Sequence, residues 1–280
     1  MSLFWYLSFK GLIKYFLFQG LTLYIRYMIK VVLLGSGNVA YHLALALKSA
    51  EHVELIQRYS RNGNNDAIFD TSLACTNNIQ ELKKADIYII AVKDDAIASL
   101  SEKLPLLDGL VVHTSGSIGM KALHVGLKKG VLYPVQTFSI HQKIDFKKVP
   151  LVIEAETNDD LQLLQMLANA LSEKVFELNS AEREKLHVAA VFANNFSNYM
   201  FACADTLCDE FKLPFDILRP MILETGLKIQ AMDPLEAQTG PARRNDQAII
   251  EKHIEMLSGG KKEIYKLLSD AISKAYHLKE

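Results

Sequence analysis

The chain has 280 residues, of which 50% are apolar and 22% charged, and its formal net charge is −1. This is the composition of a soluble globular protein, without the overall basic excess that favours nucleic acid as a partner. The length predicts two domains. Because the three cysteines fit no metal-ligand spacing, we expect free thiols, no bound metal and a cytoplasmic location.

Residues 1–27 are rich in Phe and Tyr and contain three basic residues but no acid. The longest stretch without a charge is shorter than the roughly 20 apolar residues of a transmembrane helix, and a signal-peptide cleavage site is missing. Three interpretations stay open: a start codon assigned too far upstream, a peripheral membrane anchor, or a targeting remnant. We favour the first, because Met28 directly precedes a predicted strand, and we leave 1–27 outside the domains.

A glycine-containing turn follows this strand, Ile29 to Leu34, and leads into a helix with the sequence "YHLALALKSA". In a turn of the form G-x-G-x-x-A, the first glycine permits the tight bend and the second lets the backbone approach a pyrophosphate. The phosphates would lie at the positive N-terminus of the helix. The turn therefore predicts a dinucleotide site made of Gly35, Ser36, Gly37, Asn38, Val39 and Ala40.

The end of the second predicted strand, Val53 to Gln57, indicates which dinucleotide binds. NAD-binding domains place an Asp or Glu after this strand, whereas this chain offers Ser60 and Arg61. A hydroxyl and a guanidinium suit the 2′-phosphate of NADP(H), which we therefore predict as the cofactor. The alternative is that the arginines around Ser60 are solvated loop residues.

Three more strands are predicted, at 85–92, 109–117 and 130–139, with a helix capped by Asp94 after the first of them. Strands that alternate with helices predict a parallel, doubly wound sheet, which binds ligands beyond the carboxyl ends of its strands. The residues that would face the cofactor are Ala91, Val92, Lys93, the segment 113–117 and the segment 136–138.

The second half contains two strand-like runs, 149–156 and 174–179, and then becomes almost purely helical. A capping box of Asn179 and Glu182 predicts a long helix through about Phe211. In α-helical spacing His187, Asn194 and Asn198 fall on one face. The adjacent amides of Asn194 and Asn195 are expected to be buried, either in helix–helix hydrogen bonds or facing cofactor or substrate.

Four segments together resemble the Rossmann-like proteins that carry a C-terminal DUF2520 domain: "GSGNVA", "HTSGS", "YPVQTFS", and "TGPARRND" followed by His253. Members are often described as NADP oxidoreductases of the deazaflavin-dependent type, although the sequence itself gives no support for a deazaflavin. The architecture is similar to that of 6-phosphogluconate dehydrogenase, β-hydroxyacid dehydrogenases and pyrroline-5-carboxylate reductase. The resemblance implies a helical C-terminal domain that dimerises, and hence a homodimer.

The resemblance also implies site residues. The substrate-orienting serine of β-hydroxyacid dehydrogenases falls on Ser115 or Ser117, and their asparagine pair falls on Asn194 and Asn195. Their catalytic lysine falls on Val191, so another group would have to transfer the hydroxyl proton. His187, one helical turn earlier, and His113 are the candidates.

The segment "TGPARRND" suits an anionic substrate such as a carboxylate, because Arg243 and Arg244 stand beside Asp246 in a turn at a helix start. The alternative is a solvated turn with a surface ion pair. The neighbouring His253 is interpreted as a surface histidine.

We therefore predict an α/β protein with a doubly wound Rossmann domain at 28–155 and an all-α substrate and dimerisation domain at 156–280. Its predicted function is hydride transfer between NADP(H) and a small, polar, anionic substrate in the cleft between the domains. The alternative is a non-catalytic NADP(H) sensor, which Val191 favours. A membrane partner is expected only if residues 1–27 are translated. The catalytic candidates are His113, Ser115, Gln136, His187 and Asn194, and the substrate-binding candidates are Ser117, Asn195, Arg243, Arg244 and Asp246.

Overall fold

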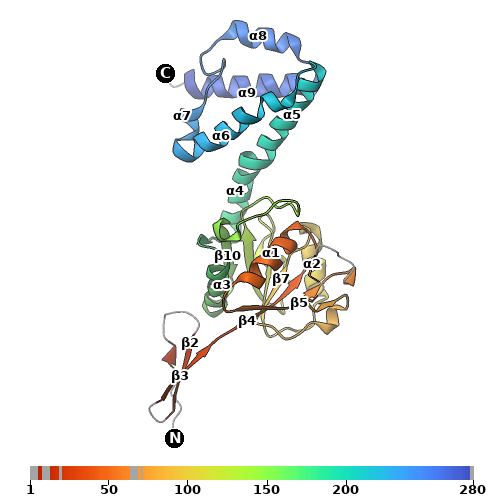
Figure 1. Cartoon of the computed structure of the whole chain (residues 1–280), viewed down its shortest axis with the longest axis vertical. Helices are drawn as coiled ribbons and strands as arrows, with labels where there is room; N and C mark the ends of the chain where they lie inside the picture. The colour runs from red at the N-terminus through yellow and green to blue at the C-terminus, as the bar shows by residue number, and fades with distance from the viewer. Residues whose placement is uncertain (1–5, 8–12, 19–20, 64–68, 71, 278–280) are drawn as a thin grey trace. The chain divides into compact units, whose positions relative to one another are not determined.

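The computed structural model describes residues 6–7, 13–18, 21–63, 69–70 and 72–277 (Figure 1). Contacts divide the chain into two compact units, Met1–Asn194 and Asn195–Glu280. The first unit contains a strand and two helices that lie after residue 155, where we predicted the domain boundary.

A mostly parallel sheet forms the centre of the first unit. In the described part of the chain, eight strands pair in the order β11-β10-β9-β8-β7-β4-β5-β6, and every neighbouring pair is parallel except β9 and β10. The strands are β4 (Ile29–Leu34), β5 (Val53–Tyr59), β6 (Cys75–Thr76), β7 (Ile87–Ile90), β8 (Leu110–His113), β9 (Lys128–Pro134), β10 (Leu151–Ala155) and β11 (Val175–Glu177).

Within the predicted parallel sheet, β10 departs from the pattern by pairing antiparallel with β9. A parallel return needs a long crossover, usually an α-helix, to carry the chain back to the starting edge. The described segment 135–150 has only a 3₁₀ turn, Phe146–Lys148, so the chain folds straight back beside β9. The predicted class, a Rossmann domain followed by a helical region, is confirmed.

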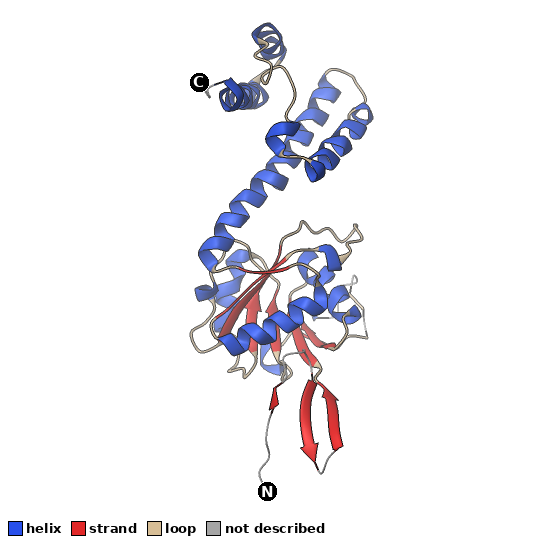
Figure 2. Cartoon of the chain, turned by 90° about the vertical axis from the view of Figure 1, so that its left-hand side faces the viewer, coloured by secondary structure: helices blue, strands red, loops and turns tan. Residues whose placement is uncertain are grey.

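Helices cover both faces of this sheet (Figure 2). Val31 and Leu33 of β4 belong to the core cluster that includes residues of α1 (Asn38–Ser49) and α3 (Asn158–Leu171). Val32 and Leu34 belong to the opposite cluster, which contains Ile97 of α2 (Asp94–Glu102). Successive residues of a strand point to opposite faces, so a continuous apolar strand is what a sheet buried on both sides requires.

Helix α2 does not begin as predicted. Lys93 is its N-cap and makes no side-chain capping bond, while Asp94 is already the first helical residue. The Asp94 carboxylate instead accepts a hydrogen bond of 2.6 Å from the Ser117 hydroxyl. The prediction of an aspartate cap was therefore wrong. The carboxylate that would have capped the helix instead accepts a hydrogen bond from Ser117, 23 positions away.

A small antiparallel sheet precedes the main one. In the described residues it consists of β1 (Tyr6–Leu7), β2 (Ile13–Phe18) and β3 (Leu21–Arg26). Tyr27 connects it to β4 and donates a hydrogen bond to the Asp86 carboxylate, which also accepts from the Lys30 backbone. Among the described residues, none of the helices has both the length and the apolarity that crossing a membrane requires.

The predicted long helix is present, but it is not uniformly α-helical. The capping box of Asn179 and Glu182 starts α4 (Ser180–Ala190), which continues as a π-helical segment (Val191–Phe196) and then as α5 (Ser197–Glu210). Asn194 and Asn195 lie in the π-helical segment and are exposed, so the prediction of buried amides was wrong. The shared face with Asn198 assumed α-helical spacing, which i→i+5 hydrogen bonding changes.

The second unit is built from helices with few buried side chains. After the 3₁₀ turn Phe215–Ile217 come α6 (Arg219–Ala231), α7 (Pro234–Ala237), α8 (Gln247–Met256) and α9 (Gly259–His277). Of the described residues in this unit, three apolar side chains are buried: Cys208, Ala242 and Ile250. Cys203 is half-buried, and all three cysteines of the chain are free thiols.

Candidate active site

The carboxyl ends of five parallel strands, β4, β5, β7, β8 and β9, meet at one edge of the sheet. Backbone hydrogen bonds tie the loops there to the neighbouring strands: Gly35 donates to Tyr59, Ala91 to Leu34, and Thr114 to Ile90, at 3.0, 2.8 and 3.2 Å. The predicted cofactor residues Gly35–Ala40, Ser60–Arg61 and Ala91–Lys93 follow these strands, so the structure brings them to one edge.

The turn after β4 has the shape that a pyrophosphate needs. Gly35 adopts φ = +146°, and a Cβ at this position would lie 2.1 Å from the Ala91 carbonyl oxygen, so the bend requires glycine. A Cβ on Gly37 would meet no atom of the described residues within 4 Å, which leaves its outer side open to a ligand. In this described region α1 begins with no side-chain cap and no acid in its first turn, so its N-terminus keeps its positive character.

The loop after β9 contacts this turn. The Asn38 side chain donates to the Phe138 carbonyl at 2.9 Å, and the buried His42 ring contacts the Ser139 carbonyl at 2.9 Å. Gln136 is exposed, and its side-chain oxygen accepts from the Thr137 backbone at 2.8 Å. Asn38 therefore positions the loop that carries the predicted catalytic candidate Gln136.

The arginine near the end of β5 and the arginine in the loop after it differ in exposure. Arg58 is buried, with its guanidinium 4.0 Å from the Phe69 ring centroid, and it donates to the Gly63 carbonyl at 3.3 Å. Arg61 is exposed. Ser60 is buried, and its hydroxyl accepts from the Asn62 backbone at 3.3 Å. Arg61 is thus the arginine of this loop whose side chain is accessible to a phosphate.

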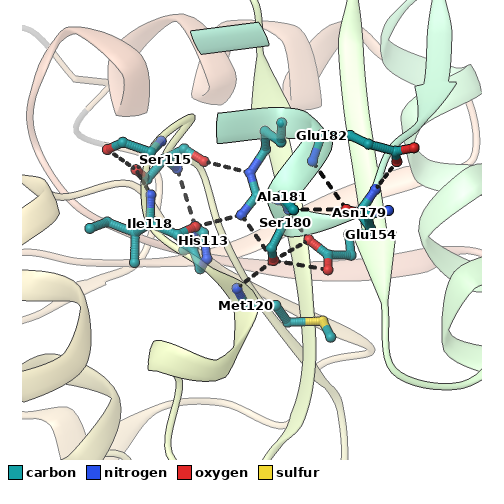
Figure 3. Close-up of polar contacts among 11 residues, drawn as sticks. His113, Ser115, Ile118, Met120, Glu154, Asn179, Ser180, Ala181 and Glu182 are labelled. Carbon is teal, nitrogen blue, oxygen red and sulfur yellow. Dashed lines mark hydrogen bonds and ion pairs between the residues drawn. The ribbon is translucent and has the colours of Figure 1, made fainter. Parts of the chain in front are cut away.

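The turn after β8 is held by its own serines (Figure 3). The buried Ser115 hydroxyl accepts from the backbone of Ser117 and Ile118 at 3.2 and 3.0 Å. The Ser115 backbone donates to His113 Nδ1 at 3.2 Å. Ser117 is half-buried and donates to Asp94. Ser115 shapes the turn, whereas Ser117 lies nearer to solvent.

His113 lies beneath this turn and is fully buried. Burial lowers the pKa of its ring from 6.5 to about 4, and the Arg183 guanidinium acts in the same direction. Its Nε2 has no hydrogen-bond partner in the described part of the chain. His113 is therefore neutral near pH 7 and has no accessible surface through which to exchange a proton with a ligand.

A buried arginine that the sequence analysis did not single out holds the same turn from α4. Arg183 is fully buried, and it donates to Glu154 Oε2 at 2.6 Å and to the Ser115 carbonyl at 3.2 Å. It also donates to the Ile118 carbonyl. Glu154 also accepts from the Ser180 hydroxyl at 2.8 Å, as Figure 3 shows.

One signal in the sequence could have revealed this contact. Glu154 interrupts the apolar strand sequence "LVIEA", and a carboxylate inside such a strand needs a partner when it is buried. Nothing in the sequence, however, identified Arg183 among the charged residues of "SAEREKLH" as that partner.

Tyr133 and His187 form a second contact between α4 and the strands. The Tyr133 hydroxyl lies 3.3 Å from His187 Nδ1, and the rings are edge-to-face with centroids 6.1 Å apart. A Cβ on Gly116 would lie 2.6 Å from His187 Nδ1 and 2.9 Å from the Tyr133 oxygen. The structure thus brings His187 to the turn after β8 and adds Tyr133, which we did not predict.

A groove of about 610 Å³ lies apart from these residues. It runs between α1, α3 and the loop 140–147, with Leu45, His141 and Phe146 among its lining residues. None of the predicted site residues lines it, so it is separate from the candidate active site.

Most of the chain is similar to a solved protein of Bacteroides fragilis whose description as an NADP oxidoreductase is provisional. The two are 37% identical, the match covers 88% of this chain and 98% of the other, and the TM-score is 0.79. A family model described as a domain of unknown function, DUF2520, matches residues 149–272. The chain belongs to the family of Rossmann-like proteins with a C-terminal DUF2520 domain.

More distant solved structures share the fold. A protein of Thermotoga maritima is 17% identical over 89% of this chain and 99% of its own, with a TM-score of 0.70. The 1-pyrroline-5-carboxylate reductase of Streptococcus pyogenes is 11% identical over 89% and 98%, with a TM-score of 0.61. Likenesses at these identities show the fold alone. No curated protein has significant sequence similarity to the chain.

The DUF2520 match begins before β10 and ends at residue 272, so it includes Glu154, Arg183 and most of the helical second unit. In that helical unit, Arg243 donates to the Gln238 carbonyl and lies 5.3 Å from the Tyr276 ring centroid. Asp246 caps α8, and Arg244 is exposed.

His253, the last residue of the family motif, is exposed, and its Nδ1 contacts the Tyr265 hydroxyl at 2.8 Å. The described residues contain no group of three or more His, Cys, Asp or Glu that could hold a metal.

Proposed function

We propose that this protein is an NADP(H)-dependent oxidoreductase. The observation that carries the proposal is the turn after β4, with Gly35 at φ = +146°, an open outer side at Gly37 and a helix N-terminus behind it. This combination fits a pyrophosphate. The relative from Bacteroides fragilis, provisionally described as an NADP oxidoreductase, supports the same cofactor.

The preference for NADP(H) over NAD(H) rests on the loop after β5. Arg61 is exposed, and it follows Ser60 in a segment where an NAD-binding domain would carry an acid. A charge-assisted hydrogen bond contributes about 1.5–3 kcal/mol. One good contact from Arg61 to a 2′-phosphate is therefore enough for about a tenfold preference.

When bound, the cofactor supplies the hydride, and the chain supplies placement and a proton. We assign the proton to His187 in preference to His113, because His113 is fully buried whereas His187 is half-buried. Ser115, which shapes the turn, and Ser117 position the site. Gln136 and Asn194 remain candidates because both side chains are exposed.

The substrate is proposed to be small, polar and anionic. Arg244 is the stronger candidate for a carboxylate, since it is exposed, whereas Arg243 already donates to a backbone carbonyl. Asn195 is also exposed, while Asp246 acts as the cap of α8.

We also propose that the protein is a homodimer through its helical unit. On α6, Met221, Leu223 and Leu227 are 61, 64 and 57% exposed, although they are large apolar side chains. Leu223 and Leu227 lie one helical turn apart, and exposed apolar surface of this kind marks a protein interface. A second copy of the chain is the occupant that the family resemblance favours.

The function is tested by adding NADPH to the full chain with a panel of imines and keto acids and following NADPH oxidation. Saturable turnover of any of them, abolished by His187→Gln, supports the oxidoreductase. NADPH binding without turnover favours the sensor, which the valine at position 191 allows. Binding of neither NADPH nor NADH contradicts both.

A further inference from the structure

We propose that Tyr133 fixes the tautomer of His187, so that the neutral imidazole carries its proton on Nε2. The inference deepens the proposed function, in which His187 moves a proton. Tyr133 would be a positioning residue that leaves Nε2–H as the ring donor available to a bound molecule. Tyr133 belongs to the segment "YPVQTFS", which also carries the catalytic candidate Gln136.

The direction of the Tyr133–His187 hydrogen bond follows from the partners available. Desolvation by burial raises the pKa of Tyr133, so the hydroxyl keeps its proton at neutral pH. His187 Nδ1, at 3.3 Å, is the acceptor that the described residues offer to this hydroxyl. If Nδ1 accepts the tyrosine proton, the single proton of the neutral ring must lie on Nε2.

The backbone at Gly116, in the β8 turn, lies close to both rings. A Cβ there would lie 2.6 Å from His187 Nδ1 and 2.7 Å from Tyr133 Cζ, closer than side-chain atoms approach one another. Glycine is thus required for the turn to lie against this pair. A methyl group at position 116 would separate His187 from Tyr133 without removing either functional group.

The face of α4 that carries His187 is also fixed one helical turn earlier. Arg183 lies four residues before His187, one turn along the helix, and is fully buried in contacts with Glu154 and the turn carbonyls. These contacts hold α4 against the β8 turn when the Tyr133 hydroxyl is removed. A change at Tyr133 should therefore act on the ring of His187 and leave the position of the helix unchanged.

The test is ¹⁵N NMR of the full chain labelled at histidine, at a pH of about 9, where histidine side chains are generally neutral. The nitrogen shifts report which ring nitrogen carries the proton, and the signal that disappears in His187→Gln identifies His187. His113 is the internal reference, because its Nδ1 accepts from the Ser115 backbone and none of the substitutions replaces either residue.

We expect His187 to be the Nε2–H tautomer in the wild type. Tyr133→Phe and Gly116→Ala should each lower the ratio of Nε2–H to Nδ1–H by about fivefold, the loss of one hydrogen bond. Gly119→Ala is the matched control, since a Cβ there meets nothing closer than 3.8 Å and the ratio should stay unchanged.

An Nδ1–H tautomer in the wild type, or an unchanged ratio in Tyr133→Phe, would overturn the proposal. Tyr133→Phe preserves the packing of the ring, so the test stands even if Gly116→Ala does not fold. The measurement needs neither cofactor nor substrate. If NADPH does not bind, the proposed function is wrong, but the tautomer measured for His187 is unaffected. Failure of the proposed function and failure of the tautomer proposal are therefore distinguishable.

Discussion

The two units of the chain differ in where their side chains find partners. In the first unit the sheet is buried on both faces, and even a fully buried Arg183 is matched by a carboxylate and two backbone carbonyls. In the second unit only three apolar side chains are buried among the described residues, while large ones such as Leu227 are exposed. The first unit therefore has a sheet core of its own, whereas most large apolar side chains of the second unit are exposed.

Breaking the buried ion pair should have the largest effect on the first unit. Arg183→Met removes the partner of Glu154 and of two carbonyls, so the free energy of unfolding should fall by about 3–5 kcal/mol. Denaturant unfolding followed by circular dichroism measures it. The control is Lys148→Met, in an exposed pair with Asp145, which should cost less than about 1 kcal/mol. Equal losses would show that the buried pair does not hold the turn.

Acid should destabilise the first unit through His113. The unfolded chain binds this proton below about pH 6.5, but the folded protein binds it only below about pH 4. Stability is therefore unaffected above pH 6.5 and is lost as the pH falls toward 4, by up to about 3 kcal/mol. Unfolding measured from pH 7 to 4.5 should show a shallower decline in His113→Gln than in the wild type. Identical slopes would mean that His113 is protonated in the folded state.

The two glycines of the turn after β4 should separate fold from binding. Gly35→Ala places a Cβ 2.1 Å from the Ala91 oxygen at a positive φ, so it should lower stability by at least about 2 kcal/mol. Beyond its neighbours in the chain, the Cβ of Gly37→Ala would lie more than 4 Å from any atom of the described residues, so this variant should fold normally. Its methyl group should weaken NADPH binding by about tenfold or more. Thermal unfolding and calorimetry measure the two effects. Unchanged NADPH affinity in Gly37→Ala would mean that a ligand does not approach this residue.

The smallest effect on stability is expected in the second unit, where the comparison predicts a change of assembly instead. Leu227→Glu should dissociate the proposed dimer and change the stability of the first unit by less than about 0.5 kcal/mol. Sedimentation gives the mass of each variant. Leu106→Glu, at an 89% exposed position of the first unit, is the control and should remain dimeric. A monomeric wild type would refute the proposed interface.

How far the sequence predicted the structure depends on how local the signal is. The strand Ile29–Leu34, the turn Gly35–Ala40 and the capping box at Asn179 were predicted from residues within a few positions of one another. The hydrophobic period, the position of a glycine and the capping residues can each be recognised within such a short segment.

The site depends on contacts between distant residues. Arg183 and Glu154 are 29 positions apart, and Tyr133 and His187 are 54 apart. These pairs form only when β9, β10 and α4 pack together. The hydrophobic periodicity of the sequence therefore does not predict them. The exposed Asn194 shows the reverse error, because the apolar run around it predicted burial, whereas its side chain in the π-helical segment is exposed.

The most direct test of the cofactor assignment is calorimetric titration of NADPH and then NADH into the full chain and into Arg61→Ala. We predict that the wild type binds NADPH at least about tenfold more tightly than NADH, and that Arg61→Ala removes most of this difference. If neither dinucleotide binds, the assignment of a dinucleotide site to the turn after β4 is wrong. Equal affinity for both in the wild type would show that Arg61 does not recognise a 2′-phosphate.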